Sequence, residues 1–139
     1  MAHYAVLDNN NIVTGVLTGK DEDDLSLLPE GYENWEDYIS KKFCNNAKVV
    51  RTSYNTMHNT HILGGTPFRG NFASMGDYYD EINDVFYPVK PLDKNSWVLD
   101  TNIWDWKPPI DYPSDYNNDN YYWDEAAYQA DNTQGWSIS

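Results

Sequence analysis

The most constraining feature of this sequence is a short unit that recurs along it: an aromatic or aliphatic residue followed by Asp, a polar turn and a second aromatic or aliphatic residue. The unit occurs at residues 7–12, 79–88, 99–109 and 123–136. Asp at the first turn position accepts a hydrogen bond from the main chain two residues on. Aromatic pairs across two strands stabilise a ribbon by about 0.2–1 kcal/mol. The pattern therefore predicts serial antiparallel β-hairpins.

The composition supports strands over helices. Six Trp, twelve Tyr and four Phe carry an unusual share of the apolar content, and aromatic residues are enriched in strands. Prolines in residues 88–91 and 108–113 each remove a donor from a strand ladder, so these segments are predicted to be extended connectors. We expect a mainly β fold with a minor α component, built from serial antiparallel hairpins joined by proline-rich connectors.

The N-terminal half adds a hairpin and short helices. Residues 3–18 read as strand, turn and strand around three consecutive Asn residues, which tolerate left-handed backbone. One or two short helices are predicted near residues 24–43. Acidic residues precede Leu25 in the first, and an aromatic and aliphatic stripe at helical spacing marks the second. A strand at residues 47–54 and a long loop at residues 55–70 follow.

The length fits one domain or one modest core with ordered extensions, because the chain has 139 residues. We divide it into residues 1–75, with the first hairpin, the short helices, a strand and the long loop, and residues 76–139, with the serial aromatic hairpins and a C-terminal extension. A lone two-stranded ribbon is marginal in water, so the hairpins must pack together or against a partner. The two segments are expected to form one structural unit.

The charge argues against two classes of partner. Nine basic residues against 22 acidic ones give a formal net charge of -13, which repels nucleic-acid phosphates and anionic lipid. We therefore expect no nucleic acid and no membrane as partner. No apolar run approaches the ~20 residues of a membrane span. The N-terminus lacks the layout of a secretory signal, which predicts synthesis in the cytoplasm.

Motifs for catalysis or metal binding are missing from the sequence. His58 and His61 lie in a polar loop without a third ligand. Residues 115–126 begin like a calcium loop, but Asn120 and Ala126 stand where Gly and Glu are needed. Composition leaves a two-carboxylate hydrolase open, yet no motif singles out a protonated acid. We predict no catalytic residues, no metal, no cofactor and no enzymatic activity.

Aromatic side chains on hairpin faces are the predicted contact residues, together with main-chain groups on open strand edges. Many of these rings must also form the core. A carbohydrate-binding module is the main alternative, because exposed coplanar rings stack on sugars. Arg51 and Arg69 are expected to pair with neighbouring carboxylates. The predicted partner-binding residues are Trp97, Trp104, Trp106, Trp123, Trp136, Tyr87, Tyr112, Arg51 and Arg69.

Several segments together resemble a known family. They are residues 51–56, residues 69–73 with Gly76, Tyr79 and Asp80, residues 84–88 with Lys90, Pro91, Ser96, Trp97, Leu99, Trp104, Pro108 and Pro109, and the opening residues 1–5 with Leu7, Asp8 and residues 11–13. These segments are similar to short virion and tail-fibre-associated structural proteins of marine tailed phages, particularly cyanophages.

The resemblance implies a setting and no catalytic residues. It implies a non-enzymatic, peripheral virion protein that decorates the capsid or accompanies the tail or its fibres. The expected location is the virion, after synthesis in the host cytoplasm. The expected partners are other virion proteins, with self-association and host glycans as further alternatives.

Overall fold

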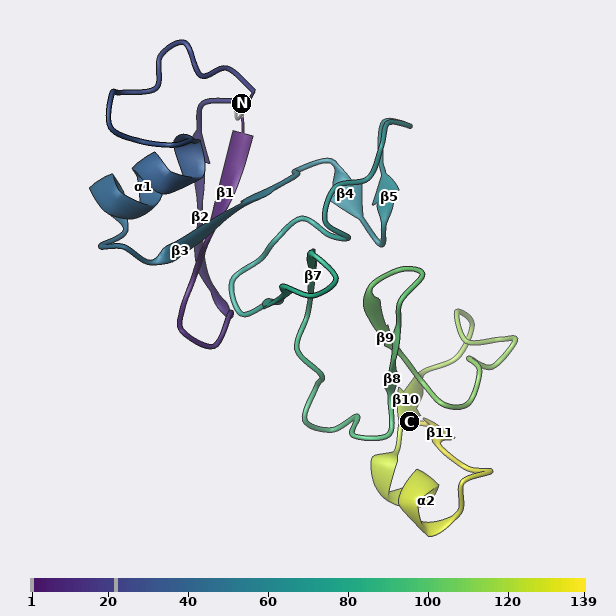
Figure 1. Cartoon of the computed structure of the whole chain (residues 1–139). Helices are drawn as coiled ribbons and strands as arrows, with labels where there is room; N and C mark the ends of the chain where they lie inside the picture. Colours follow the sequence, from purple (N-terminus) through teal and green to yellow (C-terminus); the bar gives the residue numbers. More distant parts are fainter. Residues whose placement is uncertain (1, 22) are drawn as a thin grey trace. The chain divides into compact units, whose positions relative to one another are not determined.

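The computed structural model of the chain (Figure 1) describes residues 2–21 and 23–139. The predicted fold class is confirmed, because the described residues form a mainly β structure of small antiparallel sheets with two helices. Two compact units are distinguished. Unit 1 comprises the described residues up to Val89 together with Thr101–Trp104, and unit 2 comprises Lys90–Asp100 and Asp105–Ser139. The hairpin at residues 78–87, which the sequence analysis grouped with the second segment, belongs to unit 1.

The elements of each unit follow the chain order. Unit 1 contains α1 (Trp35–Phe43) and the strands β1 (Ala2–Leu7), β2 (Val13–Gly19), β3 (Lys48–Thr52), β4 (Thr56–Met57), β5 (Thr60–His61), β6 (Tyr78–Asp80) and β7 (Val85–Tyr87). Unit 2 contains α2 (Glu125–Ala130) and the strands β8 (Val98–Asp100), β9 (Asp105–Lys107), β10 (Tyr121–Trp123) and β11 (Trp136–Ile138).

The first predicted hairpin is confirmed, and it is part of a three-stranded antiparallel sheet with the order β2-β1-β3. Asp8 Oδ1 accepts hydrogen bonds from the main-chain nitrogens of Asn10 (2.8 Å) and Ile12 (3.0 Å). Asn11 has a φ of 61°, in the left-handed region that Asn tolerates. The turn therefore follows directly from the residue types at residues 8–11.

Two further hairpins repeat one design, as predicted. The pairs β6–β7 and β8–β9 have connections of equal length, residues 81–84 and 101–104. In each connection the last residue is left-handed, with a φ of 56° at Asp84 and 52° at Trp104. Asp80 Oδ1 accepts hydrogen bonds from the next turn, at Ile82 N (3.0 Å) and Asn83 N (3.1 Å).

The last predicted hairpin also forms, but its connection holds a helix that the sequence analysis missed. Strands β10 and β11 pair with Trp123 opposite Trp136, and α2 lies between them. Asp124 Oδ1 accepts a hydrogen bond from Ala127 N at 3.0 Å and caps this helix. The same residue type that opens a hairpin turn elsewhere opens a helix here, because both require an acceptor for exposed main-chain N–H groups.

Only one helix forms in the region of residues 24–43. Residues 24–31 form turns instead of the first predicted helix, because Asp24 Oδ1 accepts from Ser26 N (3.1 Å) and Pro29 follows closely. The second predicted helix is confirmed as α1. Its cap is Asn34, whose Oδ1 accepts from Asp37 N at 2.8 Å.

The predicted long loop at residues 55–70 is partly ordered into a small hairpin. Strands β4 and β5 pair, with Thr56 opposite His61 and Met57 opposite Thr60. Between them, His58 and Asn59 are left-handed, with φ values of 48° and 58°. A hairpin of two-residue strands leaves almost no period-2 pattern, which is why the sequence did not reveal it.

The core of unit 1 lies on both faces of the three-stranded sheet. On one face α1 packs through Trp35 and Ile39 against Tyr4 and Val49. On the other face the members of the second cluster gather, from the sheet, from β6–β7 and from Ala73. Alternate residues of β1 point to opposite faces, as the strand period requires. This second cluster consists of Ala5, Leu7, Val13, Val50, Ala73, Tyr79 and Phe86.

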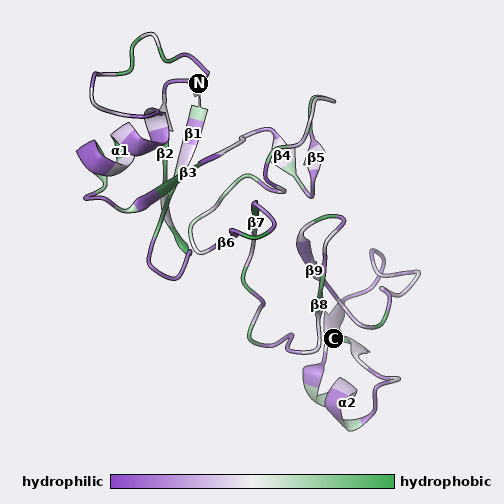
Figure 2. Cartoon of the chain, in the orientation of Figure 1, coloured by the Kyte–Doolittle hydropathy of each residue, from purple (hydrophilic) through white to green (hydrophobic). Residues whose placement is uncertain are grey.

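Hydrophobic and hydrophilic residues alternate over short distances along the ribbon (Figure 2). Neither helix in the described part of the chain is long and apolar enough to cross a membrane. Apolar surface is instead buried in small patches between short elements.

Two glycines of β2 give a matched test of this packing. A Cβ at Gly19 would lie 3.0 Å from Tyr4 Cε2 and 3.4 Å from Ile39 Cδ1, whereas a Cβ at Gly15 would meet nothing within 4 Å. Tyr4 and Ile39 are buried and have little room to move. Gly19→Ala is expected to lower the free energy of unfolding by about 1–3 kcal/mol through overpacking. Gly15→Ala is expected to be neutral or slightly stabilising. Urea denaturation of both variants decides the matter, and equal midpoints would contradict the packing.

Candidate docking surfaces

Unit 2 is built around three indole rings. The ring centroids are 6.0 Å apart for Trp97 and Trp123, 5.2 Å for Trp123 and Trp136, and 6.3 Å for Trp97 and Trp136. The first two pairs meet at interplanar angles of 84° and 78°, the edge-to-face arrangement that aromatic quadrupoles favour. Gly135 leaves room for this cluster, because a Cβ there would overlap the six-membered ring of Trp123.

Two of the predicted contact residues are core residues. Trp97 is 6% exposed and Trp123 is 8% exposed. Both indoles pack mainly against other rings of unit 2, and a contact role for Trp97 and Trp123 stays a prediction. The sequence shows an aromatic residue's type but not which of many rings is covered by the others.

A tyrosine rim, defined as Tyr112 and Tyr116, lies over the third indole. The ring of Trp136 is 5.1 Å from that of Tyr112 and 5.5 Å from that of Tyr116, and the two tyrosine rings are 4.9 Å apart. Trp136 Nε1 donates to Ile110 O at 3.1 Å and is fixed in place. Tyr112 is 48% exposed and Tyr116 is exposed as well. The rim therefore presents ordered aromatic surface to solvent.

A hollow of about 330 Å³ opens beside the tyrosine rim. It is lined by aromatic rings and by two charged side chains from the segment before β8. The ammonium group of Lys94 lies 4.5 Å from the centroid of Trp97, a cation–π contact. The sequence analysis did not predict that residues 116–122 contribute to such a hollow, because it compared this segment only with a calcium loop. The lining residues are Asp93, Lys94, Trp97, Tyr116, Tyr121, Tyr122, Trp123 and Trp136.

Glu125, at the start of α2, connects this aromatic core to β8. Its Oε1 accepts from Ser96 N (3.1 Å), Ser96 Oγ (2.7 Å) and Trp123 Nε1 (3.1 Å), and its Oε2 accepts from Gln129 Nε2 (2.6 Å). Desolvation raises the pKa of Glu125, but the hydrogen bonds from Gln129, Ser96 and Trp123 together outweigh it and lower the pKa to about 2. The carboxylate thus acts as a fixed acceptor.

The two predicted arginines lie in unit 1 beside Phe68. Arg69 Nε donates to Asp84 Oδ1 at 2.8 Å, and Arg69 Nη1 donates to the main-chain oxygen of Arg51 at 2.8 Å. Both guanidinium groups lie over the Phe68 ring, at 4.6 Å for Arg69 and 5.4 Å for Arg51. The expected pairing with a carboxylate is confirmed for Arg69. Both arginine side chains therefore contact other residues of unit 1.

Tyr79 shares the same carboxylate. Its hydroxyl donates to Asp84 Oδ1. Burial, then the hydrogen bond to Asp84 and the charge of Asp84, raise the pKa of Tyr79 to about 12. A phenol with so high a pKa stays protonated and donates throughout the physiological range. The group therefore stabilises the connection of β6–β7.

Tyr87 and Trp104 stack on each other in unit 1. Their ring centroids are 5.9 Å apart with an interplanar angle of 11°. Asn71 Nδ2 donates to the main-chain oxygens of Trp104 (2.9 Å) and Phe86 (2.8 Å). A Cβ at Gly70 would lie only 3.1 Å from Trp104 Cδ1. The ring pair is half-buried, and the structural role of Asn71, which the sequence analysis did not single out, is to hold it.

The remaining predicted residue, Trp106, is half-buried on β9, with the ammonium of Lys90 5.0 Å from its ring.

The two histidines considered for metal binding lie in the segment that contains β4 and β5. His61 Nδ1 accepts hydrogen bonds from Leu63 N and Gly65 N, both at 3.1 Å. Across the described residues, no group of three His, Cys, Asp or Glu side chains is placed to hold a metal ion.

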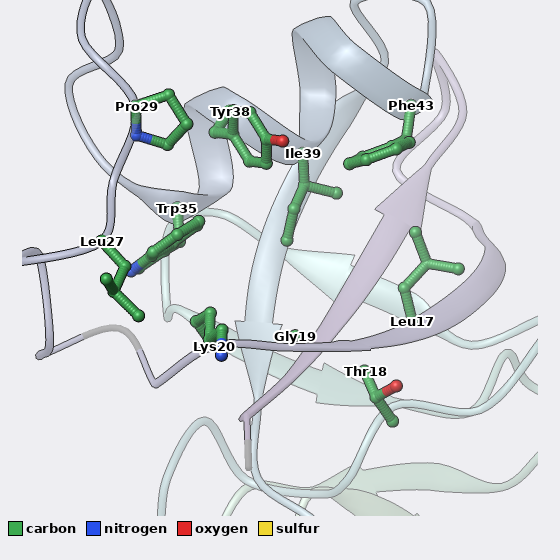
Figure 3. Close-up of a pocket in the computed structure, with 10 residues that line it drawn as sticks. All are labelled: Leu17, Thr18, Gly19, Lys20, Leu27, Pro29, Trp35, Tyr38, Ile39 and Phe43. Atoms are coloured by element: carbon green, nitrogen blue, oxygen red, sulfur yellow. The ribbon is translucent and has the colours of Figure 1, made fainter.

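Unit 1 contains an apolar groove of about 320 Å³ between α1 and β2 (Figure 3). In the close-up, Trp35, Ile39 and Phe43 come from the helix and face Leu17 and Gly19 on the strand. The sequence predicted the helical stripe but placed all of it in the core, whereas Phe43 is 66% exposed. The groove residues are Leu17, Thr18, Gly19, Lys20, Leu27, Pro29, Trp35, Tyr38, Ile39 and Phe43.

The lowered pKa of Glu125 gives a prediction about acid stability. A carboxyl group whose pKa is lowered on folding stabilises the fold fully above its unfolded pKa of 4.5, and this contribution is lost as the pH falls towards about 2. Glu125→Gln should reduce the stability of unit 2 at neutral pH, and the gap to the unchanged protein should shrink between pH 4.5 and about 2. Urea denaturation followed at the Trp123 indole N–H signal measures the gap.

Glu30→Gln is the control for this experiment, because Glu30 is exposed in unit 1. It is expected to leave the unfolding of unit 2 unchanged at each pH. A gap for Glu125→Gln that stays constant down to about pH 2 would show that the four hydrogen bonds do not depend on the charge of the carboxylate.

Comparison of the chain with models of protein families, with curated proteins and with solved structures finds no match. The similarity to phage structural proteins therefore remains a prediction from the segments quoted above.

Proposed function

We propose that the chain is a non-enzymatic structural component of a phage virion, a peripheral protein that decorates the capsid or accompanies the tail or its fibres. The single observation that carries this proposal is the tyrosine rim on the indole core of unit 2. Tyr112 and Tyr116 are exposed while the rings beneath them are fixed. The setting comes from the sequence resemblance, and the docking mode comes from the rim.

An ordered aromatic rim suits docking for an entropic reason. Tyrosine has few rotatable bonds, so its ring offers a large contact area at low conformational cost. The contacts with Trp136, which is itself hydrogen-bonded to Ile110 O, restrict the rings before any partner arrives. Binding energy is then not spent on ordering the surface. Tyrosines in such positions are common hot spots of protein interfaces.

The charge supports a basic or neutral docking surface on the larger assembly. A net charge of -13 steers the chain towards positive potential and away from anionic surfaces. The same charge opposes close contact between copies of the chain, unless a basic surface lies between them. Other virion proteins are accordingly the proposed partners, ahead of self-association.

A carbohydrate-binding module is the second candidate, and the hollow beside the tyrosine rim favours it. Aromatic rings and the polar groups of Asp93 and Lys94 line the same space of about 330 Å³, within the range of small-ligand sites. A sugar would stack on a ring, donate hydrogen bonds to the carboxylate of Asp93 and accept them from the ammonium group of Lys94. Host-surface glycans are the proposed ligand class in this case.

The test is the number of copies per particle in purified virions, measured by quantitative mass spectrometry. For the unchanged chain we expect a copy number that fits the symmetry of a capsid lattice or of a tail. Replacing both tyrosines of the rim by Ala should lower incorporation by about tenfold or more. Tyr122→Ala, at an exposed position of the hollow, is a second and milder variant.

Tyr54→Ala is the matched control, because Tyr54 is an exposed tyrosine of unit 1. It should be incorporated as well as the unchanged chain. A urea midpoint within the range of the control shows that a rim variant is folded. Absence of the chain from purified virions would overturn the first proposal. Glycan-array binding that is lost in Tyr122→Ala would favour the second.

A further inference from the structure

Strand β2 has an open edge over most of its length. Its start is covered, because Val13 N donates to Asp77 O and Gly76 N donates to Val13 O, both at 2.8 Å. From residue 14 to residue 19, the main chain has no hydrogen bond to any described residue outside the pairing with β1. One side of the strand therefore presents ladder donors and acceptors to solvent.

The open edge lacks the usual protection against strand pairing. Strand edges are normally blunted by charged residues, prolines or bulges. The sequence of β2, Val-Thr-Gly-Val-Leu-Thr-Gly, contains no charge and no proline, although 22% of the chain is charged. Its bulge lies opposite Val6 and Leu7, near the covered start. The opposite edge strand β3 carries Lys48 and Arg51, so the sheet protects one edge and leaves the other open.

The apolar groove runs beside this open edge. Figure 3 shows Leu17 and Gly19 on β2 beneath Ile39 and Phe43 of α1. Leu17 and Phe43 are exposed, although both are large and apolar. Main-chain groups and an apolar hollow of about 320 Å³ thus lie on the same side of β2. An added strand needs this combination, because the main chain gives affinity and alternate side chains fill pockets.

The groove is bordered by an acidic loop. Residues 20–31 contribute Lys20, Leu27 and Pro29 to the lining, and the described residues of this loop include four acidic residues against that one lysine. The loop is fixed at two points, because Tyr4 OH donates to Lys20 O and Trp35 Nε1 donates to Asp24 O, both at 2.7 Å. A basic occupant is favoured, and a second copy of this chain, with its own charge of -13, is disfavoured.

We propose that β2 and the groove bind an extended basic segment of a partner protein, which adds to the open edge as a further antiparallel or parallel strand. Its alternate apolar side chains enter the groove, and its positive charge is attracted by the acidic loop and by the net charge of the chain. This inference goes beyond the proposed function, because it concerns unit 1 and makes no use of the tyrosine rim.

The probe is an acetylated and amidated peptide of alternating valine and lysine, as long as β2, titrated into the full chain and followed by NMR. We expect saturable shifts of the amides of residues 15–19 and of the Trp35 indole. Leu17→Ser and Phe43→Ser, at exposed positions of the groove, should each weaken binding by about tenfold or more. Ile82→Ser is the matched control, because Ile82 is an exposed apolar residue of unit 1 outside the groove.

Two N-methylated forms of the peptide test strand addition without changing the protein. In an added strand, only every second residue turns its N–H to β2. Methylation of either the valine or the lysine nitrogens should therefore abolish binding, while methylation of the other set leaves it. Equal binding of both methylated forms would show that the peptide does not add to β2 as a strand. Equal binding of a peptide with glutamate in place of lysine would show that the site does not prefer a basic segment.

Two other outcomes would also overturn the proposal. The first is a set of shifts confined to residues outside the groove and β2. The second is concentration-dependent broadening of the β2 signals without peptide, with a dimer in analytical ultracentrifugation, because the edge would then be occupied by a second copy. Neither outcome bears on the copy number in virions, so the two proposals fail independently.

Discussion

The structure depends on burying aromatic rings against ribbons that are too short to be stable alone. Strands of three residues form few ladder hydrogen bonds, and a single two-stranded ribbon is marginal in water. In β6–β7 the rings of Tyr79 and Phe86 are 4.9 Å apart, and in β10–β11 those of Trp123 and Trp136 are 5.2 Å apart. Each ring pair connects the two strands and extends into a cluster beyond them. The high aromatic content is thus the means by which such small sheets fold.

Local chemistry was predictable from the sequence, because it depends on residues close along the chain. Asp8 and Asp80 accept hydrogen bonds from the main chain of their own turns, as the recurring unit predicts. Long-range packing was not predictable. The burial of Trp97 depends on Trp123 and Trp136, which lie far along the chain, and nothing within a few residues of Trp97 indicates it. Asp124 shows the limit of local reasoning, because one acceptor serves a turn and a helix cap equally well.

The candidate surfaces also combine features that the sequence reveals with features that depend on long-range packing. The sequence pointed to aromatic residues as contacts, and one of them, Tyr112, is exposed in the structure. It did not reveal the groove, because the groove requires Phe43 at the end of α1 to remain uncovered beside β2. The helical stripe has the same period whether its last member is buried or exposed. The acidic loop was visible in the sequence, but its position at the groove was not.

The three closely packed indoles give unit 2 an optical property of its own. Chromophores whose centroids are 5.2–6.3 Å apart and whose planes are steeply inclined couple their electronic transitions. Such coupling produces intense circular dichroism bands that disappear when the rings separate. Trp35, in unit 1, has no indole in contact within its own core cluster. Spectroscopy can therefore follow the melting of unit 2 separately, without an attached label.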